Sequence, residues 1–554
     1  MFGIRFRAGV PPSVEVTGAV ERLGPLAIVG DVRLDARGEL LARLPAGARD
    51  LSDKALCLHA YALWGERCVE QLAGDFCFAL WDDKQGSLVA ARDRLGIKPL
   101  FHASAGGAVL VSDSLDWIMG HAEVSRALDE VWIGDFLAAG LSLDFARTVR
   151  RDVARVPPAH LLKVDAGGET VRRYWRLEIG DPVDLHARQV PERFVELVQR
   201  AIGDRLPSSG PVGISMSGGL DSTTLAACAV AVTGDPARVV GECYQYERLM
   251  TDDEGRFATL AAERLGIRLR LTAVDDLTYD PQWRERGLDT GEPSLSIVLR
   301  HHDDVLARGM AAESSVWFYG EGPDNALHFD RDPYFAWLRA RRDWGGLARA
   351  ALDYTRVKGV SGWGATLGRA LRRRDAGEAR TPWTPPNWIE PGFARRLHLA
   401  ERIGDLGVYG RDLHPWHPTA VGSFQDPIWP SLFDKLREGT GGGLFEWRHP
   451  FLDLRVLEFM IALPPVPWAW FKHLLRVAMR GRLPDEILTR AKTPLAVQPL
   501  LAALSDHPLP PLSGDGRLAA YVDARAVSPD DGTQALSHKQ LIAVHALDYW
   551  LARE

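Results

Sequence analysis

"SMSGGLDST", residues 215–223, decides the fold of this chain because it joins a short apolar run at 212–214 to a helix-like run at 224–232. Gly218 and Gly219 carry no side chain at this corner, so backbone N–H groups can surround an anion there. The N-terminus of the following helix adds a positive dipole that favours the same anion. The stretch therefore predicts a strand–loop–helix unit of an α/β domain, with a phosphate-binding site at the corner.

An aspartate in the middle of this corner indicates a metal ion beside the phosphate. The hydroxyl groups of Ser217 and Ser222 can donate hydrogen bonds to phosphate oxygens. The stretch does not match the Walker A pattern, because no Gly-Lys-Ser/Thr follows it. A carboxylate next to a polyphosphate is favourable when Mg²⁺ lies between them. We therefore expect Asp221 to be a magnesium ligand; the alternative is an ordinary helix cap with Asp221 in its first turn.

A second strand end, "WFYGEGPDNAL" at 317–327, has the same character. Ligands of doubly wound sheets bind outside the carboxyl ends of the strands. Asp324 is therefore expected to complete the metal site with Asp221, and the backbone of Tyr319 and Gly320 to face the nucleotide. The alternative is an ordinary acidic turn with a proline at its bend, but two such turns on neighbouring strand ends favour function.

The composition describes a globular chain of at least two domains. A length of 554 residues exceeds one ordinary core, and 46% apolar with 25% charged residues is typical of folded proteins. A net charge of -7 disfavours nucleic acid as the main partner. Five cysteines without a CxxC pair indicate reduced thiols. No apolar run approaches the roughly 20 residues of a membrane span, and no signal peptide is evident, so we expect a cytoplasmic protein.

The pattern of elements changes near residue 185. Strand-length runs separated by turn residues lie at 77–83, 87–93 and 108–114, after a helix-like run at 52–73. This first half predicts an α+β domain over 1–180. Alternating strand and helix patterns then predict a parallel sheet with helices on both faces, within a second domain over 186–554. Residues 330–480 are mostly helix-like.

Several motifs, in matching order, resemble those of the asparagine synthetase family. "SGGLDS" at 217–222 is similar to the pyrophosphate-binding loop of ATP pyrophosphatases. Residues 74–101 resemble the glutaminase-type domain of the family, and residues 447–464 and 471–495 its synthetase domain. The resemblance implies a degenerate glutaminase-like αββα sandwich followed by a Rossmann-like ATP-pyrophosphatase domain with helical additions. It covers most of the chain except roughly 330–440.

The resemblance also implies a chemistry: a carboxylate is adenylated by ATP with Mg²⁺, pyrophosphate leaves, and an amine attacks the acyl-adenylate. The implied ATP-binding residues are Ser215, Ser217, Gly218, Gly219, Asp221, Ser222, Tyr319 and Gly320. The implied metal ligands are Asp221 and Asp324. Lys492 matches the lysine that stabilises developing negative charge. Lys472 and Arg490 are further candidates for the same electropositive pocket.

One departure from the family concerns the source of the amine. The family's glutaminase uses a cysteine at position two, which becomes the N-terminal nucleophile, but this chain begins Met1-Phe2. Without that thiol no γ-glutamyl thioester forms, so no glutaminase activity is expected and the first domain becomes a structural remnant. Cys57, Cys68 and Cys77 cannot replace it, because the chemistry uses the chain's own terminal amine as base.

The other departure is "GEGPDN" at 320–325, where asparagine synthetases carry GEGSDE. An enzyme of this type without glutaminase takes its amine most simply from the substrate, as β-lactam synthetases and the macrolactam-forming lasso peptide cyclases do. The β-lactam branch typically has tyrosine at the position of Glu321. The motif therefore looks more like that of the lasso cyclases.

We accordingly expect an Asp or Glu side chain of a precursor core peptide to be adenylated and attacked by the peptide's own N-terminal amine. Such an amine has a pKa of about 7.7–8.0, so a weak base suffices, and Glu321 is the catalytic candidate for orienting or deprotonating it. Holding both peptide ends together is an orientation problem. A leader peptidase and a leader-binding protein are the expected partners.

Other interpretations of particular residues remain open. Trp383, Trp388, Trp416 and Trp429 could shape a peptide pocket, although helix-packing core is the better interpretation for any single one. His301, His302, Asp303 and Asp304 fit a polar helix face better than a metal site, because consecutive helical residues point in different directions. The rival functions are small-molecule ligation (β-lactam formation or ammonia-dependent asparagine synthesis) and a degenerate binding scaffold without catalysis.

Overall fold

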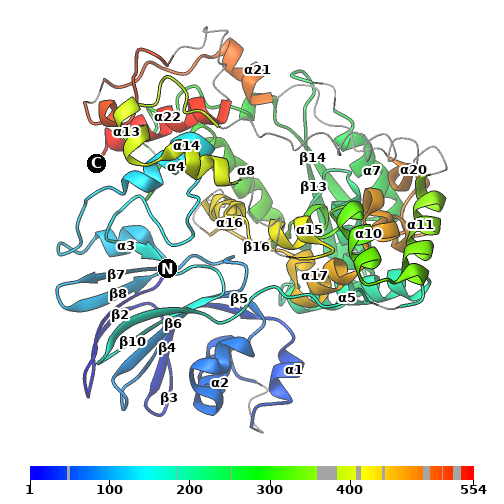
Figure 1. The fold of residues 1–554 in the computed structure, drawn as a ribbon, viewed down its shortest axis with the longest axis horizontal. Coiled ribbons are helices and arrows are strands. Elements are labelled where there is room, and N and C mark those ends of the chain that lie inside the picture. The colour runs from blue at the N-terminus through cyan, green and yellow to red at the C-terminus, as the bar shows by residue number, and fades with distance from the viewer. Residues whose placement is uncertain are drawn as a thin grey trace.

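The computed structural model describes residues 1–45, 50–183, 185–250, 252–287, 289–358, 383–406, 414–438, 443–490, 499–514, 516–527 and 538–554. Figure 1 shows a two-sheet sandwich from the first part of the chain at lower left and an α/β unit on the right. Further helices lie above the sandwich. Among the described residues no helix is long and apolar enough to cross a membrane.

The sandwich is built from two antiparallel sheets. One contains β1 (Gly3–Arg7), β2 (Ser13–Thr17), β7 (Phe101–Ala105), β8 (Ala108–Ser112) and β9 (Ala154–Arg155), in the order β2-β1-β8-β7-β9. The other contains β3 (Glu21–Leu23), β4 (Leu26–Leu34), β5 (Gly74–Asp82), β6 (Ser87–Arg92), β10 (His160–Asp165) and β11 (Gly168–Arg173), in the order β11-β10-β6-β5-β4-β3. Alternate residues of β5 face opposite sides, which gives the sheet two buried faces.

Helices cover the outer faces of both sheets. The inner layer joins Phe2 and Ile4 to Val29 and Trp81 of the opposite sheet. The outer face of one sheet packs against α2 (Asp53–Trp64), and that of the other against α3 (Leu115–Met119). A short helix, α1 (Arg37–Leu41), follows β4. The predicted αββα sandwich is therefore confirmed.

The second part contains a five-stranded parallel sheet in the order β14-β13-β12-β15-β16. Its strands are β12 (Val212–Ser215), β13 (Val239–Gln245), β14 (Arg268–Ala273), β15 (Val316–Phe318) and β16 (Glu446–Arg448). The strand order runs outward from β12 in one direction and from β15 in the other. The junction of β12 and β15 is a topological switch point, where open α/β sheets bind ligands beyond the carboxyl ends of their strands.

Both faces of this sheet are buried, as predicted. Ile214 and Phe318 belong to a core shared with α5 (Gln189–Arg205), α6 (Leu220–Thr233) and α7 (Glu254–Leu265). On the other face, Trp317 packs with Met310 of α8 (Arg300–Glu313).

Most of the remaining described chain is helical. The additions are α4 (Glu130–Ala139), α9 (Pro323–Ala326), α10 (Arg331–Ala340), α11 (Trp344–Lys358), α13 (Pro391–Arg396), α14 (Leu399–Leu406), α15 (Pro418–Ser423), α16 (Ile428–Glu438), α17 (Leu454–Ala462), α18 (Pro465–Trp468), α19 (His473–Ala478), α20 (Asp485–Thr489), α21 (Pro499–Asp506) and α22 (His538–Leu551). Helix α4 shares an apolar core with α13, α14 and α22, so the end of the chain folds back onto its first half (Figure 1).

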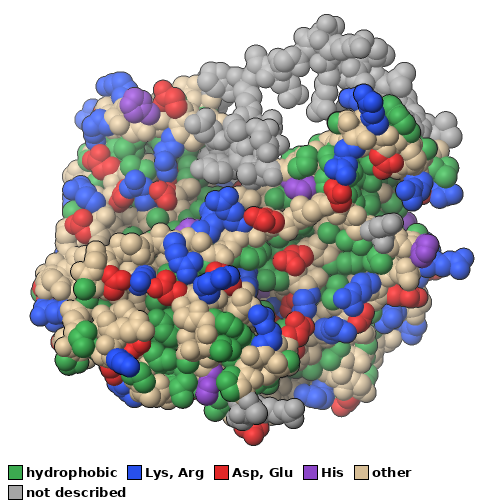
Figure 2. Space-filling view, turned by 60° about the horizontal axis from the view of Figure 1, so that its bottom comes forward, with side chains coloured by type: hydrophobic (Ala, Val, Ile, Leu, Met, Phe, Trp, Pro, Cys, Tyr) green, Lys and Arg blue, Asp and Glu red, His purple; other side chains and the backbone are tan. Residues whose placement is uncertain are grey.

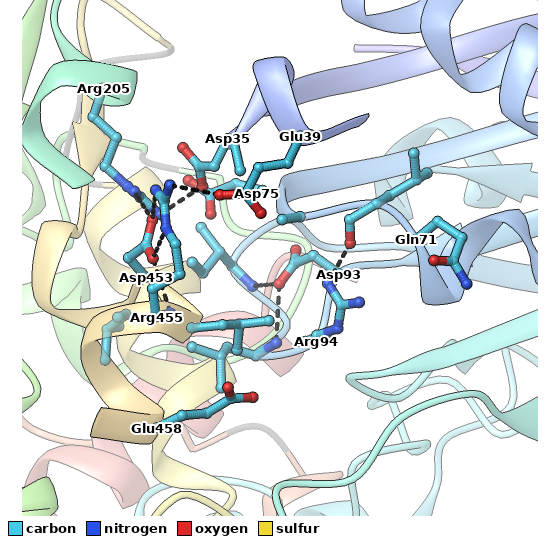
Figure 3. Close-up of a pocket in the computed structure, with 18 residues that line it drawn as sticks. Asp35, Glu39, Gln71, Asp75, Asp93, Arg94, Arg205, Asp453, Arg455 and Glu458 are labelled. Carbon is cyan, nitrogen blue, oxygen red and sulfur yellow. Dashed lines mark hydrogen bonds and ion pairs between the residues drawn. The ribbon is translucent and has the colours of Figure 1, made fainter. Parts of the chain in front are cut away.

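Buried ion pairs join the sandwich to the α/β unit. At the end of α5, the guanidinium of Arg205 donates to Asp35 at 2.6 Å and to Asp453 at 2.7 Å, and all three side chains are buried. Within the sandwich, Arg33 pairs with Asp75 at 2.5 Å, and Figure 3 shows Asp75 beside Asp35. Burial alone would raise the pKa of Asp453, but hydrogen bonds and charges from Arg455 and Arg205 hold it at about 2. The two units are thus fixed to each other by paired charges.

The exposed surface shows no field of one sign on the face drawn in Figure 2, where Lys and Arg side chains are interspersed with Asp and Glu.

Candidate active site

The glycine corner lies at the switch point, between the end of β12 and the start of α6. Gly218 has a left-handed backbone with φ of 60°. A Cβ atom there would lie 2.6 Å from the carbonyl oxygen of Glu254 and 2.7 Å from Cβ of Phe257. Only glycine therefore allows the first turn of α7 to lie against the loop.

The serine hydroxyls of the corner are oriented by the loop itself. Ser222 Oγ accepts from the Ser217 N–H at 3.2 Å and donates to the Gly219 carbonyl at 3.3 Å. Gly219 is the N-cap residue of α6 and supplies no side-chain hydrogen bond to it. The first turn of α6 therefore presents N–H groups of the kind that bind phosphates at helix N-termini.

The second predicted turn touches the first. A Cβ atom on Gly320 would lie 3.4 Å from the backbone nitrogen of Ser222 and 3.6 Å from Cβ of Asp221. The N–H of Tyr319 donates to the carbonyl of Arg448 at 3.1 Å, so this group serves the sheet rather than a ligand. The two strand ends are thus brought together as the sequence predicted.

Both predicted metal ligands contact one cation, Lys472. Its Nζ lies 2.5 Å from Asp221 Oδ2 and 2.7 Å from Asp324 Oδ1. Burial alone would lower the pKa of Lys472, but the charges of the two aspartates outweigh this and hold it above its usual value. Lys472 and the preceding Phe471 both have left-handed backbones, with φ of 54° and 45°. Two consecutive non-glycine residues rarely adopt this conformation, so the surrounding structure fixes the direction of the lysine.

These residues fit a magnesium ion. Two carboxylates that converge on one ammonium group can also converge on Mg²⁺, which takes one or two carboxylates and completes its shell with water and phosphate oxygens. The side chain of Asp324 is 50% exposed, which leaves that side open to such ligands. A separate acidic group, Asp35 with Asp204 and Asp453, has its charges answered by Arg205 and Arg455 and is not a cation site.

Two charged residues, Glu254 of α7 and Arg490 beside it, lie near the glycine corner. The guanidinium of Arg490 lies 4.3 Å from the ring centre of Phe257, which itself lies against Gly218. Burial and the charge of Asp252 raise the pKa of Glu254 to about 7, although Arg490 opposes the shift. Arg490 is thus at the corner, as expected, whereas Glu254 had no signal in the sequence beyond its place in a helical first turn.

The two predicted catalytic residues differ in what the structure shows of them. Glu321 lies between Gly320 and Gly322, partly buried. Burial and the charge of Glu321 raise the pKa of Tyr319 to about 12. Lys492 lies outside the described residues.

Phe2, at the position where the sequence predicts the glutaminase nucleophile, is part of the sandwich core. Phe2 is 3% exposed, packs in the layer between the two sheets, and donates its N–H to Asp113 at 2.8 Å. Burial raises the pKa of the Cys68 thiol to about 12 and also raises those of Cys57 and Cys77. None of these thiols is both exposed and acidic enough to be a nucleophile.

The remaining hypotheses from the sequence concern four tryptophans and the His301–Asp304 segment. Trp388, Trp416 and Trp429 are buried in three separate apolar clusters, and Trp383 packs partly buried against the first of these. The His301–Asp304 segment lies on α8, and no metal-ligating group is found there among the described residues.

An antiparallel αββα sandwich joined to a parallel sheet with a phosphate corner at its switch point defines an amidotransferase-like ATP-dependent ligase. The chain belongs to the asparagine synthase family. The family profile described as "Asparagine synthase" matches residues 193–551, and that described as "Glutamine amidotransferase domain" matches residues 37–175. Members use ATP, typically with Mg²⁺. The chain is therefore an asparagine synthetase-like amide ligase.

Similar proteins cover most of its length. "Asparagine synthetase [glutamine-hydrolyzing] 3" of Bacillus subtilis is 26% identical over 488 residues, spanning 83% of this chain and 73% of that protein. "Amidase chyE" of Penicillium rubens is 29% identical over 504 residues, spanning 80% and 72%. "Amidase chry2" of Gibberella zeae is 27% identical over 500 residues, spanning 80% and 72%.

Proposed function

We propose that this chain is a lasso-type macrolactam synthetase, which joins an Asp or Glu side chain of a precursor core peptide to the N-terminal amine of the same peptide. One contrast carries the proposal. Phe2 fills the nucleophile position with a buried ring, while Asp221 and Asp324 still converge on one cation. A ligase that keeps its adenylation corner without a glutaminase nucleophile takes its amine from its substrate.

The reaction has two bond-forming steps. A carboxylate oxygen of the peptide attacks the α-phosphorus of ATP, the bond to the bridging oxygen breaks, and pyrophosphate leaves. The peptide amine then attacks the acyl carbon, loses a proton, and AMP leaves as the amide forms. No atom of glutamine is required.

Residues of the corner act on the leaving group in this proposal. The N–H groups of the first turn of α6 and the hydroxyls of Ser217 and Ser222 bind pyrophosphate. Asp221 and Asp324 hold Mg²⁺, which supplies positive charge against the phosphates when bound. Lys472, held as a cation at the same point, donates to phosphate oxygens, and Lys492 is proposed to stabilise the charge that develops in the transition state.

Glu321 is proposed to orient or deprotonate the attacking amine. It follows Gly320, whose backbone touches the first turn of α6, so it lies at the edge of the nucleotide corner. A leader peptidase and a leader-binding protein are the proposed partners, because the amine must be released from a leader before it can attack.

Purified protein tests the proposal directly. With MgATP and peptides that carry a free α-amine and an internal Asp or Glu, we expect a product lighter by one water, together with AMP and pyrophosphate. Formation of asparagine from free aspartate and ammonium, with the peptides unchanged, would instead identify the chain as an ammonia-dependent asparagine synthetase. No ATP-dependent product with either substrate would favour the scaffold.

A further inference from the structure

A second cavity lies outside the nucleotide corner, where the two halves of the chain meet. Its volume is about 440 Å³. The walls come from α4 and the loop after it, the segment before α8, α16, and the two C-terminal helices α21 and α22. We propose that this cavity binds apolar side chains of the peptide substrate; the inference rests on the proposed function and names the substrate class of the same site.

The cavity lies at the ligand-binding edge of the parallel sheet. Helices α8 and α16 lead into the parallel strands β15 and β16, so each helix starts at the edge where those strands end. Most residues of 292–299, directly before α8, and most of 427–435, at the start of α16, line the cavity. The glycine corner occupies the same edge.

Helix α16 lines the cavity with one face and packs toward the nucleotide corner with the other. Four residues at helical spacing line the cavity: Ile428, Ser431, Leu432 and Lys435. On the opposite face, the ring of Phe433 lies 5.1 Å from His449, which lies 6.2 Å from the ring of Tyr319. Tyr319 directly precedes the Gly320–Asp324 turn. The cavity and that turn therefore lie on opposite sides of α16, with the rings of His449 and Tyr319 between the helix and the turn.

The chemistry of the walls selects an apolar ligand. Trp132, Phe136, Leu295 and Leu299 supply aromatic and aliphatic surface. On one wall the charged groups form ion pairs with each other: Arg155 pairs with Glu292 and, at 2.7 Å, with Asp434. At the mouth, Ile428 keeps 49% of its surface exposed. A pocket of this size and lining is of the class that binds ligands larger than aspartate or ammonia.

Peptide binding without ATP tests the proposal. The probes are two pools of short fluorescent peptides, each with a free α-amine and one internal Asp. The remaining variable positions hold Phe or Leu in one pool and Ser in the other. Ile428→Asp is the test variant. Residue 428 is the first of α16, where the helix dipole favours an acidic side chain, so the substitution should not disrupt the helix. Leu352→Asp is the matched control, since Leu352 is 51% exposed on α11, away from the cavity.

We expect fluorescence anisotropy to show that the wild type binds the Phe/Leu pool more tightly than the Ser pool. Ile428→Asp should weaken binding of the Phe/Leu pool about tenfold, from the loss of one apolar side chain that the bound peptide would cover. Leu352→Asp should bind as the wild type does, and both variants should keep the wild-type affinity for MgATP. This second readout shows that the nucleotide corner is intact.

Two results would overturn the assignment in different ways. If the wild type cyclises peptides but Ile428→Asp binds the Phe/Leu pool as tightly as wild type, the cavity is not the peptide site, although the proposed function stands. If the wild type binds neither pool and makes asparagine from free aspartate, the proposed function fails and the peptide cavity with it.

Discussion

The two halves of the chain differ in which features of the asparagine synthase family they retain. The sandwich has two sheets and covering helices, and Phe2, at the predicted nucleophile position, is buried in its core. The α/β unit brings two carboxylates and a lysine together at the switch point, where the chemistry is proposed to occur. A fold depends on many apolar contacts that tolerate change, whereas an active site depends on a few polar atoms in fixed positions.

The interface explains why the sandwich is retained. Arg205 donates from its guanidinium to carboxylates of both halves (Figure 3). Helix α4 of the first half shares a core with α22 at the end of the chain. Without the sandwich, Arg205 would lose its pair with Asp35 and keep only that with Asp453. The first half is therefore proposed to act as a structural part of the ligase.

The largest effect is expected from breaking the chemistry of the second half. Asp221→Ala removes a carboxylate that contacts Lys472 and is proposed to hold Mg²⁺, and we expect pyrophosphate release to fall by about 10²–10³-fold. EDTA should abolish the wild-type reaction, and excess Mg²⁺ should restore it. Asp353→Ala on α11, where the carboxylate pairs with Arg356 at 2.9 Å, is the control and should keep full activity. Equal activity of Asp221→Ala and wild type would remove that aspartate from the mechanism.

A smaller effect is expected from breaking the interface. Arg205→Met leaves Asp35 and Asp453 each with one arginine fewer in a buried environment, so the free energy of unfolding should fall by about 3 kcal/mol. Urea denaturation followed by circular dichroism measures this. Arg193→Met, on the same helix in an exposed pair with Glu196, should leave the midpoint unchanged. An unchanged midpoint for Arg205→Met would show that the two halves are independent.

Truncating the residue that replaces the nucleophile sharpens the comparison further. Phe2→Ala removes a ring from the sandwich core, which should cost about 3 kcal/mol of folding free energy. Turnover of the proposed ligase reaction, measured at a temperature where both proteins are folded, should change less than about twofold, because the ring is remote from the corner. A large loss of turnover in fully folded Phe2→Ala would give the first half a part in the chemistry.

The smallest effect concerns pH. Burial and the charge of Asp252 raise the pKa of Glu254 in the folded state to about 7, above its value in the unfolded chain. The folded state therefore favours the protonated carboxyl, and this contribution to stability is complete below the unfolded pKa. That contribution is lost as the pH rises toward and through 7. Glu254→Gln should therefore show a smaller fall in Tm between pH 5 and 8 than wild type. A steeper fall in the variant would contradict the raised pKa.

Local patterns in the sequence were sufficient for much of this architecture. Small residues after an apolar run marked the corner at 215–223, and alternation of strands and helices indicated the parallel sheet, since both signals depend on neighbouring residues. The αββα layers and the family followed from motifs. The buried position of Trp388, Trp416 and Trp429 was the better interpretation of those residues and is confirmed.

Other features depend on residues far apart in the chain. Lys472 reaches Asp221 across 251 positions, and its left-handed backbone has no pattern in the sequence. The cavity walls combine segments from α4 to α22, and the partners of Arg205 lie in both halves. Such contacts are set by tertiary packing, so local periodicity carries no trace of them.

The most direct test of the proposed function is whether the amide nitrogen comes from the peptide or from glutamine. The protein is incubated with MgATP, the peptide pool with a free α-amine, and glutamine labelled with nitrogen-15 in its side-chain amide, and the products are weighed by mass spectrometry. We expect a peptide that is lighter by one water and contains no label. Label in any amide product would contradict the proposed function, because the first half would then still supply ammonia from glutamine.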